Sequence, residues 1–274
     1  MRSEKTEILL KHELEKNKVF FEVFRDVFGG MMFRRQFVGF IPNHDKYLKT
    51  WSELGIVFSS DIGSNKLYRM CRCKPLQMLS PRQITGALIL RNMLRYYYYI
   101  SRGFTTPEQV LEFSKKGSDR VMRTSVPMEL LQNYNTSFEA KGVHIPNFVS
   151  EEKANIIRRL SFRNIAITHT TYKSGTITPH LVIYQILRTT PSKLAELITL
   201  AHRLCSDLFY ADGIKIDPDV TICRFECNDD MPQVITALQK RREFLCLSSE
   251  TLEERLHTIS VVRKLGYINP ALIL

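Results

Sequence analysis

The spacing of apolar residues divides the chain into a helical first half and a mixed second half. Apolar residues three or four positions apart predict helices in the first half over residues 3–28, 32–40, 44–54, 80–102, 107–115 and 127–135. Two short apolar runs at residues 56–59 and 66–73, separated by the turn-rich loop SSDIGSN, predict a pair of strands. The first 75 residues should therefore fold as three helices followed by a hairpin.

After residue 150 the pattern changes to β-branched runs that alternate with helical ones. Strands are predicted at residues 164–172, 178–187 and 219–227. Helices are predicted at residues 151–159, 192–210, 231–245 and 249–264. The strand-containing part thus has the order β-β-α-β-α-α. We expect an α/β (α+β) protein with three parts, which are residues 1–78, a helical linker or dimerisation region at 79–150, and a small α/β domain at 151–274.

The composition suits a cytoplasmic protein with a sizeable core. The chain has 274 residues, of which 44% are hydrophobic. Its apolar runs are broken by charge and fall short of the ~20 residues that span a bilayer, and its charged N-terminus lacks the apolar stretch of a secretory signal. The six cysteines are sparse, so we expect them to be reduced.

The excess of positive over negative charge lies entirely in the first 163 residues. Residues 1–75 carry 14 Lys and Arg against 9 Asp and Glu, and residues 76–163 carry 13 against 7, whereas residues 164–274 carry 12 of each. The net charge of +11 therefore comes entirely from one side of the sequence. A one-sided positive field favours a polyanionic partner, and nucleic acid is the commonest one.

The helix predicted at residues 44–54 has an apolar side and a polar side. Its outward side places Lys46 and Lys49 where they could meet phosphates or bases, and Thr50 and Ser52 where they could donate hydrogen bonds. Asp45 and Glu53 on the same side make its own charge zero. Affinity for DNA would then depend on basic residues nearby.

The segment LKTWSELGIVFSS, followed by a polar turn and KLYRM, resembles the winged-helix superfamily over about residues 15–75. The resemblance implies that the third helix enters the major groove of double-stranded DNA. It also implies backbone contacts from Arg34 and Arg35 on the preceding helix, and from Lys66, Arg69 and Arg72 on the wing. Some winged helices act only as protein–protein modules, and a neutral outward side suits that role as well.

The stretch RNMLRYYYYISRGF predicts a helix with Arg91, Arg95 and Arg102 on one side, together with Tyr98. One interpretation is phosphate contact with base stacking. Core packing is the stronger interpretation, because four consecutive tyrosines point in every direction around a helix. Apolar residues on more than one side of this helix favour a homodimer contact.

No catalytic, cofactor or metal pattern emerges from the sequence, and we expect a protein that is not an enzyme. A metal-dependent nuclease of the PD-(D/E)xK type needs carboxylates on two strands and a lysine two positions after the second. Here Asp219 and Glu226 fall on one predicted strand, and position 228 is Asn. The pairs Cys71–Cys73 and Cys223–Cys227 lack the four-ligand spacing of a zinc site.

A helical DNA-binding module followed by an α/β domain containing RFECNDDMPQVI is similar to the replication-relaxation group of plasmids and conjugative elements. That resemblance implies a role in mobile-element replication or transcription regulation, with a replication or regulatory protein as a further partner. A nuclease and a protein–protein adaptor remain as alternatives.

Overall fold

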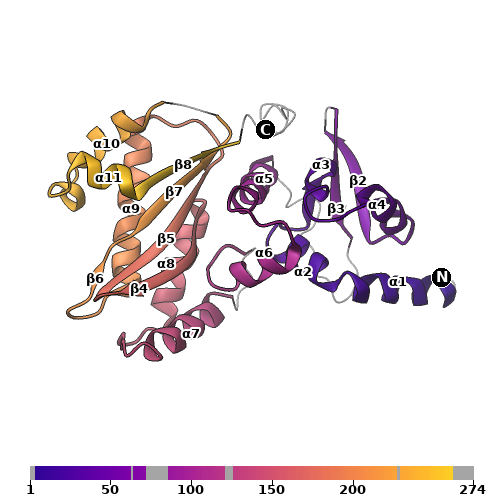
Figure 1. The fold of residues 1–274 in the computed structure, drawn as a ribbon, viewed down its shortest axis with the longest axis horizontal. Coiled ribbons are helices and arrows are strands. Elements are labelled where there is room, and N and C mark those ends of the chain that lie inside the picture. Colours follow the sequence, from indigo (N-terminus) through magenta and orange to yellow (C-terminus); the bar gives the residue numbers. More distant parts are fainter. Residues whose placement is uncertain (1–3, 63, 72–85, 121–125, 227–228, 262–274) are drawn as a thin grey trace. The chain divides into compact units, whose positions relative to one another are not determined.

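A computed structural model describes residues 4–62, 64–71, 86–120, 126–226 and 229–261 of the chain (Figure 1). It confirms a mixed α/β protein with helices and two sheets. Residues up to Glu112 belong to one compact unit, and Phe113–Lys264 form a second. The boundaries predicted after residues 78 and 150 thus differ from this division, which places the helix at 86–101 in the first unit.

The first unit is built from helices around a small antiparallel sheet. Its elements are α1 (Glu4–Lys16), α2 (Lys18–Asp26), β1 (Met31–Phe33), α3 (Arg34–Phe37), α4 (His44–Glu53), β2 (Val57–Ile62), β3 (Asn65–Met70), α5 (Gly86–Ser101) and α6 (Pro107–Ser114). The strands lie in the order β1-β3-β2, and β2 and β3 form the hairpin expected from the sequence.

Two of the helices predicted for the first unit differ from the structure. The helix expected over residues 3–28 is two helices that meet at Asn17, whose side-chain amide donates to the Glu13 carbonyl at 3.0 Å. The helix expected over residues 32–40 begins instead as strand β1, followed by the short α3. All three β1 residues are buried, which a helix with one apolar side cannot achieve but a strand covered on both faces can.

The side of α4 that faces the core is held by aromatic packing. Trp51 is fully buried, and its ring stacks on Phe20 with centroids 5.4 Å apart. The indole N–H of Trp51 donates to the Glu13 carboxylate at 3.0 Å. Asn43, which precedes α4, has a left-handed backbone with φ of 55°, and its side chain makes no capping hydrogen bond.

The tyrosine-rich helix α5 is a core element, as the stronger interpretation predicted. Tyr96, Tyr97, Tyr98 and Tyr99 are all buried, and Tyr96 packs edge-on against Phe28 and Phe40. Arg95 is buried as well and donates to the carbonyl oxygen of Val27 at 3.3 Å. The proposed basic stripe for base stacking is therefore wrong at its central residue.

The second unit packs helices against one face of a mixed sheet. Its elements are α7 (Val126–Glu139), α8 (Glu151–Phe162), β4 (Ile165–Lys173), β5 (Thr176–Gln185), α9 (Pro191–Phe209), β6 (Lys215–Ile216), β7 (Asp219–Arg224), α10 (Met231–Gln239), a 3-10 turn (Arg242–Phe244), α11 (Ser249–Arg255) and β8 (Leu256–Ser260). The strand order is β4-β5-β7-β8, with β6 beside β5. β4 and β5 pair antiparallel, and the other pairs are parallel.

The helix predicted over residues 249–264 is wrong in its second half, because β8 occupies residues 256–260. The stretch LHTISVV is rich in β-branched residues, which favour a strand when a neighbouring strand is available. Here β8 pairs in parallel with β7, from Leu256 beside Val220 to Ser260 beside Arg224. The helix predicted over residues 231–245 is also shorter, since α10 ends at Gln239.

Alternation along the strands separates the two faces of this sheet. Leu181 of β5, and Val220 and Ile222 of β7, belong to the core under α8 and α9. His180 of β5 and Asp219 of β7 lie on the opposite face. That face is where the polar residues of the second unit converge.

Candidate functional site

At the start of α4, Arg34 and Asp45 form an ion pair that the sequence did not predict. The Arg34 guanidinium binds the Asp45 carboxylate through two hydrogen bonds, Nε to Oδ1 at 2.8 Å and Nη2 to Oδ2 at 2.7 Å. This ion pair holds the pKa of Asp45 below its usual value, chiefly through the hydrogen bond. Arg34 therefore neutralises the acidic residue at the start of α4.

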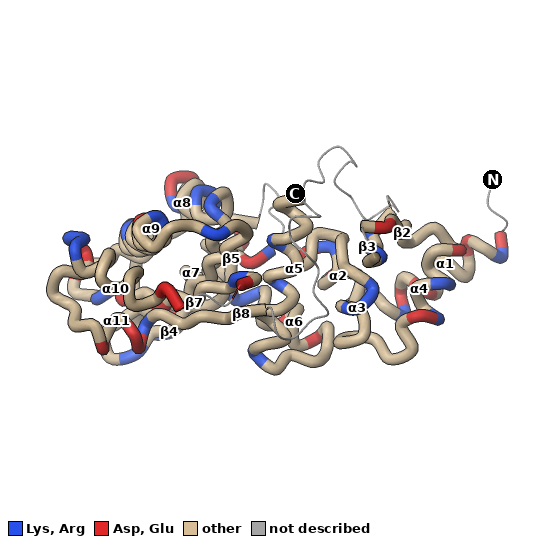
Figure 2. The backbone as a smooth tube through the Cα atoms, turned by 90° about the horizontal axis from the view of Figure 1, so that it is seen from above, with Lys and Arg blue, Asp and Glu red and all other residues tan. Residues whose placement is uncertain are grey.

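Lys46 and Lys49 are exposed on α4, as the helical spacing predicted. Neither forms an ion pair with another residue that the structure describes. Figure 2 shows basic and acidic residues together along α4, which agrees with its mixed charge. With Asp45 engaged by Arg34, the two lysines are the cations that α4 can offer to a partner.

The remaining candidate residues differ in how accessible they are. Thr50 is half-buried, and the Ser52 hydroxyl donates to the Leu48 carbonyl at 2.7 Å, so its proton is already used within the helix. Arg35 is exposed on α3. In such positions Thr50 and Ser52 are poor donors to a ligand.

The hairpin presents one exposed and one half-buried basic residue. Lys66 is exposed and lies directly across from Asp61 of β2, so part of its charge is offset. Arg69 is half-buried between Met31 and Phe58 in the strand register. Arg72, also predicted to contact DNA, lies outside the described residues.

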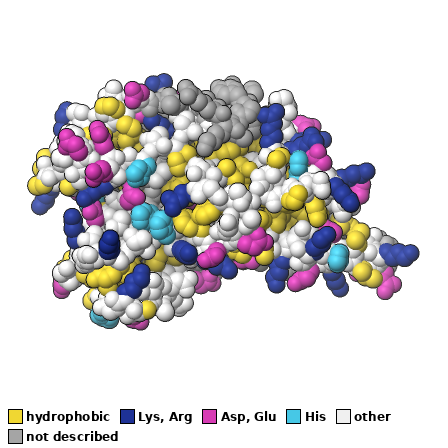
Figure 3. Space-filling model, viewed as in Figure 1, with side chains coloured by type: hydrophobic (Ala, Val, Ile, Leu, Met, Phe, Trp, Pro, Cys, Tyr) yellow, Lys and Arg dark blue, Asp and Glu magenta, His cyan; other side chains and the backbone are white. Residues whose placement is uncertain are grey.

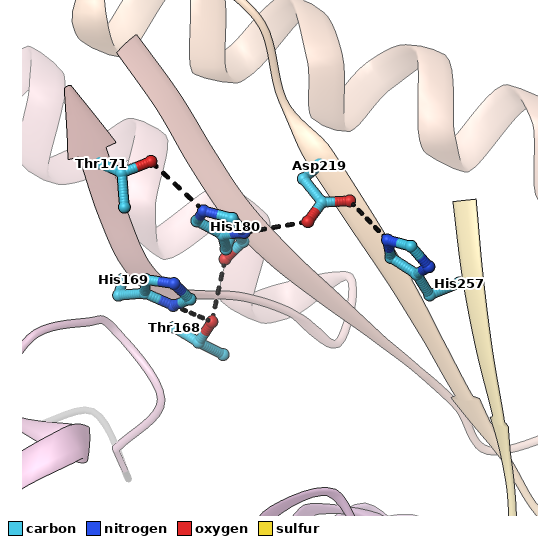
Figure 4. Close-up of polar contacts among 6 residues, drawn as sticks. All are labelled: Thr168, His169, Thr171, His180, Asp219 and His257. Carbon is cyan, nitrogen blue, oxygen red and sulfur yellow. Dashed lines mark hydrogen bonds and ion pairs between the residues drawn. The ribbon is translucent and has the colours of Figure 1, made fainter. Parts of the chain in front are cut away.

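A second polar constellation, which we call the histidine cluster, lies on the open face of the sheet in the second unit. It consists of His169 on β4, His180 on β5, Asp219 on β7 and His257 on β8 (Figure 4). His169 pairs with His180 in the register, and His180 pairs with Asp219, so their side chains share one face. Figure 3 shows histidine side chains at the surface of this unit.

A β-bulge at Thr168 brings His169 into the histidine cluster. The register shifts between Ile167 and His169, which leaves Thr168 without an opposing residue. The Thr168 hydroxyl donates to the His180 carbonyl at 3.1 Å and lies 3.1 Å from His169 Nδ1. The rings of His169 and His180 then stack with centroids 3.9 Å apart and planes 3° from parallel.

The Asp219 carboxylate lies between the imidazoles of His180 and His257. Its Oδ2 is 2.9 Å from His180 Nδ1, and its Oδ1 is 3.2 Å from His257 Nε2. Only the His180 contact has the geometry of a hydrogen bond, and Oδ1 makes an ion-pair contact. Burial raises the pKa of Asp219, but the His180 hydrogen bond and the charges of the histidines outweigh it and hold that pKa below its usual value.

Hydrogen-bond donors and acceptors fix the tautomer of His180. An ionised carboxylate only accepts, so His180 Nδ1 carries a proton toward Asp219. In the neutral ring, Nε2 is then an acceptor, and it lies 3.4 Å from the Thr171 hydroxyl oxygen. Thr171, His180 and Asp219 form a continuous chain of hydroxyl, imidazole and carboxylate.

The structure describes four of the six cysteines, and none is in a disulfide. Cys71, Cys205 and Cys223 are buried, Cys246 is exposed, and burial raises the pKa of the Cys205 and Cys223 thiols. Within the described ranges, no group of three or more His, Cys, Asp or Glu residues is arranged to hold a metal ion.

The histidine cluster was not predictable from the sequence, because its members are spread over 89 positions and come together only through strand pairing. The one local signal is polar residues at alternating positions, such as His169 and Thr171, inside an otherwise β-branched strand. Of the predicted DNA contacts, the structure brings together Arg34 and the polar side of α4.

No protein-family model, no curated protein and no solved structure matches this chain. In the part of the chain that the structure describes, every helix is too short or too polar to cross a membrane.

Proposed function

We propose that the first unit is a winged-helix module that binds duplex DNA with α4 in the major groove. The order of α2, β1, α3, α4 and the β2–β3 hairpin, with strands arranged β1-β3-β2, supports this assignment. In such a module the third helix meets the bases, and the hairpin lies along the neighbouring backbone.

The Arg34–Asp45 ion pair carries the proposal. Without it, the outward side of α4 would present Asp45 against the DNA backbone. With the carboxylate neutralised in two hydrogen bonds, Lys46 and Lys49 remain exposed and available for phosphates. Arg35 and Lys66 add exposed positive charge on the flanking elements.

Lys46→Ala combined with Lys49→Ala tests the contact. Each lysine that meets a phosphate contributes about 0.9 to the slope of log affinity against log salt, so the double variant should lose about 2 units of slope and bind more weakly. The measurement is fluorescence anisotropy of a labelled duplex across a salt series. Lys193→Ala with Lys240→Ala removes the same charge from exposed positions of the second unit and should leave the slope unchanged. An unchanged slope in the α4 variant would contradict the proposal.

Asp45→Asn tests the ion pair itself. The substitution removes a negative charge from the DNA-facing side and releases Arg34, so we expect tighter binding and a steeper salt slope. Glu53→Gln removes the same charge from the same side of α4 but leaves the Arg34–Asp45 ion pair intact, so it separates the effect of charge from the release of Arg34. If Asp45→Asn weakens binding, Arg34 has to be held by Asp45 in order to make its contact.

A protein–protein adaptor is the second candidate function, and two exposed apolar side chains favour it. Val38 follows α3 and Phe58 lies on β2, and each is 60% exposed. An adaptor would bind a protein partner and leave the mobility of duplex DNA unchanged at micromolar concentration.

Incubation of supercoiled DNA with Mg²⁺ and Mn²⁺ tests the nuclease alternative, for which we expect intact DNA. Replication or regulation of a mobile element, and a homodimer, remain predictions from the sequence.

A further inference from the structure

We propose that the histidine cluster is an acyl-transfer site, in which the Thr171 hydroxyl is the nucleophile, His180 is the base and Asp219 orients His180. The substrate class is a neutral carboxylic ester. The proposal is independent of DNA binding by the first unit. It rests on the two contacts of His180, which are 2.9 Å from Nδ1 to Asp219 and 3.4 Å from Nε2 to Thr171.

The connectivity of these contacts matches the chemistry of an activated hydroxyl. A hydroxyl beside an imidazole nitrogen, with a carboxylate on the other nitrogen, is the arrangement that lowers the cost of removing the hydroxyl proton. The 3.4 Å separation is longer than the distance needed for proton transfer, and such contacts shorten when a substrate is bound. Thr171 is exposed at an edge strand, so a substrate can reach its oxygen.

Three neighbouring residues restrict the position of His180, either directly or through Asp219. The His169 ring stacks on His180 at 3.9 Å, which restricts rotation of the His180 ring. His257 lies 3.2 Å from the second oxygen of Asp219 and helps to keep the carboxylate ionised and oriented. Asp219 and His180 side chains are each 26% exposed, so the contact between them is partly shielded from water. Figure 4 shows Thr171, His180, Asp219 and His257 following one another across the four strands, with His169 beside His180.

The charge of the site selects the substrate class. His180 has to be neutral in order to act as a base, and the Asp219 carboxylate that contacts it is an anion. That charge repels a phosphate ester, which is itself an anion, whereas a neutral carboxylic ester meets no such repulsion. A neutral carbonyl compound is therefore the electrophile that best suits the site.

The proposed step conserves atoms and charge. Thr171 Oγ1 attacks the carbonyl carbon while His180 Nε2 takes the hydroxyl proton, and the tetrahedral intermediate breaks the bond to the alcohol, which leaves with that proton. Water then attacks the acyl–threonine ester with His180 again as the base. The products are the carboxylic acid and the free Thr171 hydroxyl.

The first experiment is covalent labelling of the full chain with an alkyl fluorophosphonate, followed by peptide mass spectrometry. The probe is a neutral ester that forms a bond to an activated hydroxyl oxygen and releases fluoride. We expect the label on Thr171, retained in Thr171→Ser and lost in Thr171→Val and in His180→Ala. Thr178→Val is the matched control, because Thr178 lies opposite Thr171 on the same face. A wild-type protein without label, or a label that persists in Thr171→Val, would overturn the proposal.

The second experiment follows hydrolysis of p-nitrophenyl acetate. Asp219→Asn should lower kcat by about 10²–10⁴-fold, the usual contribution of an oriented acid or base, and leave KM unchanged. Equal far-UV circular dichroism spectra of the variant and the wild type show that the sheet is intact. Thr171→Val separates the nucleophile from the base, because hydrolysis by an imidazole alone would survive this change and refute a role for Thr171.

Discussion

Gly117 is a position where a single added methyl group should disturb the histidine cluster. The backbone of Gly117 passes directly over the bulge in β4. A Cβ atom there would overlap the carbonyl oxygens of Ile167 and Thr168 and would lie 2.5 Å from the carbonyl carbon of Thr168. Ordinary contacts begin near 3.4 Å, so Gly117→Ala requires the segment or the bulge to retreat by about 1 Å.

The cost of that movement follows from the contacts beside Gly117. The next residue, Ser118, donates its backbone N–H to the Ile167 carbonyl at 2.6 Å and accepts the Ile167 N–H on its hydroxyl at 2.9 Å. Losing both bonds costs about 1–3 kcal/mol, and overpacking of a dense region adds a similar amount. We expect Gly117→Ala to lower the free energy of unfolding by about 2–6 kcal/mol and to abolish labelling of Thr171.

Urea unfolding followed by far-UV circular dichroism measures this change, provided that the slope against urea concentration is unaltered. Ser118→Ala is the matched variant, because it removes one of the two hydrogen bonds without adding a Cβ clash, and it should cost less than Gly117→Ala. A Gly117→Ala protein within about 0.5 kcal/mol of wild type, the range of neutral surface substitutions, would refute the close-approach argument.

Three further predictions concern charge and burial. The pKa of Asp219 lies below its usual value, so its carboxylate stabilises the fold above about pH 4, and the excess stability of wild type over Asp219→Asn should shrink as the pH falls below that value; urea midpoints across an acid series measure it. Burial raises the pKa of Tyr96 to about 12. The contribution of this residue to the free energy of unfolding should stay level up to about pH 10 and fall between pH 10 and 12, because only the unfolded chain ionises at Tyr96 in that range. Tyr96→Phe should weaken that fall in alkaline urea titrations. Glu13→Ala should lower the free energy of unfolding by about 1–3 kcal/mol, because it leaves the indole N–H of Trp51 buried without an acceptor, and Glu13→Gln should lower it less. The fluorescence of Trp51, the only tryptophan in the chain, follows the unfolding of both variants. Equal losses would contradict a role for the acceptor.

The elements with a clear apolar side were predictable from the sequence. For α4, the spacing of Leu48 and Trp51 placed Lys46 and Lys49 on the outward side, and the structure agrees. The start of α6 carries a local signal of the same kind, since Thr106 and Gln109 exchange hydrogen bonds there. Both features depend on residues within one turn of each other, which a local pattern records.

Elements that depend on distant partners were not predictable. β8 contains residues that also fit a helix, and only pairing with β7 decides the outcome. The Arg34–Asp45 ion pair joins residues that are eleven positions apart across a turn. The sequence therefore showed both charges but not that they contact each other. His257 reaches the histidine cluster only because β8 is a strand, and thus the wrong prediction of a helix there also hid a member of the site.

The two proposed sites should respond differently to salt, and this difference separates them experimentally. Binding through Lys46 and Lys49 releases counterions from DNA, so affinity should fall steeply between about 50 mM and about 200 mM salt. In the histidine cluster, the reacting groups touch at 2.9 Å and 3.4 Å and the carboxylate is only 26% exposed, so mobile ions screen them little. The neutral fluorophosphonate adds no charge of its own. Labelling of Thr171 should therefore remain nearly constant over the salt range in which DNA is released, and a parallel loss of both signals would mean that one site depends on the other.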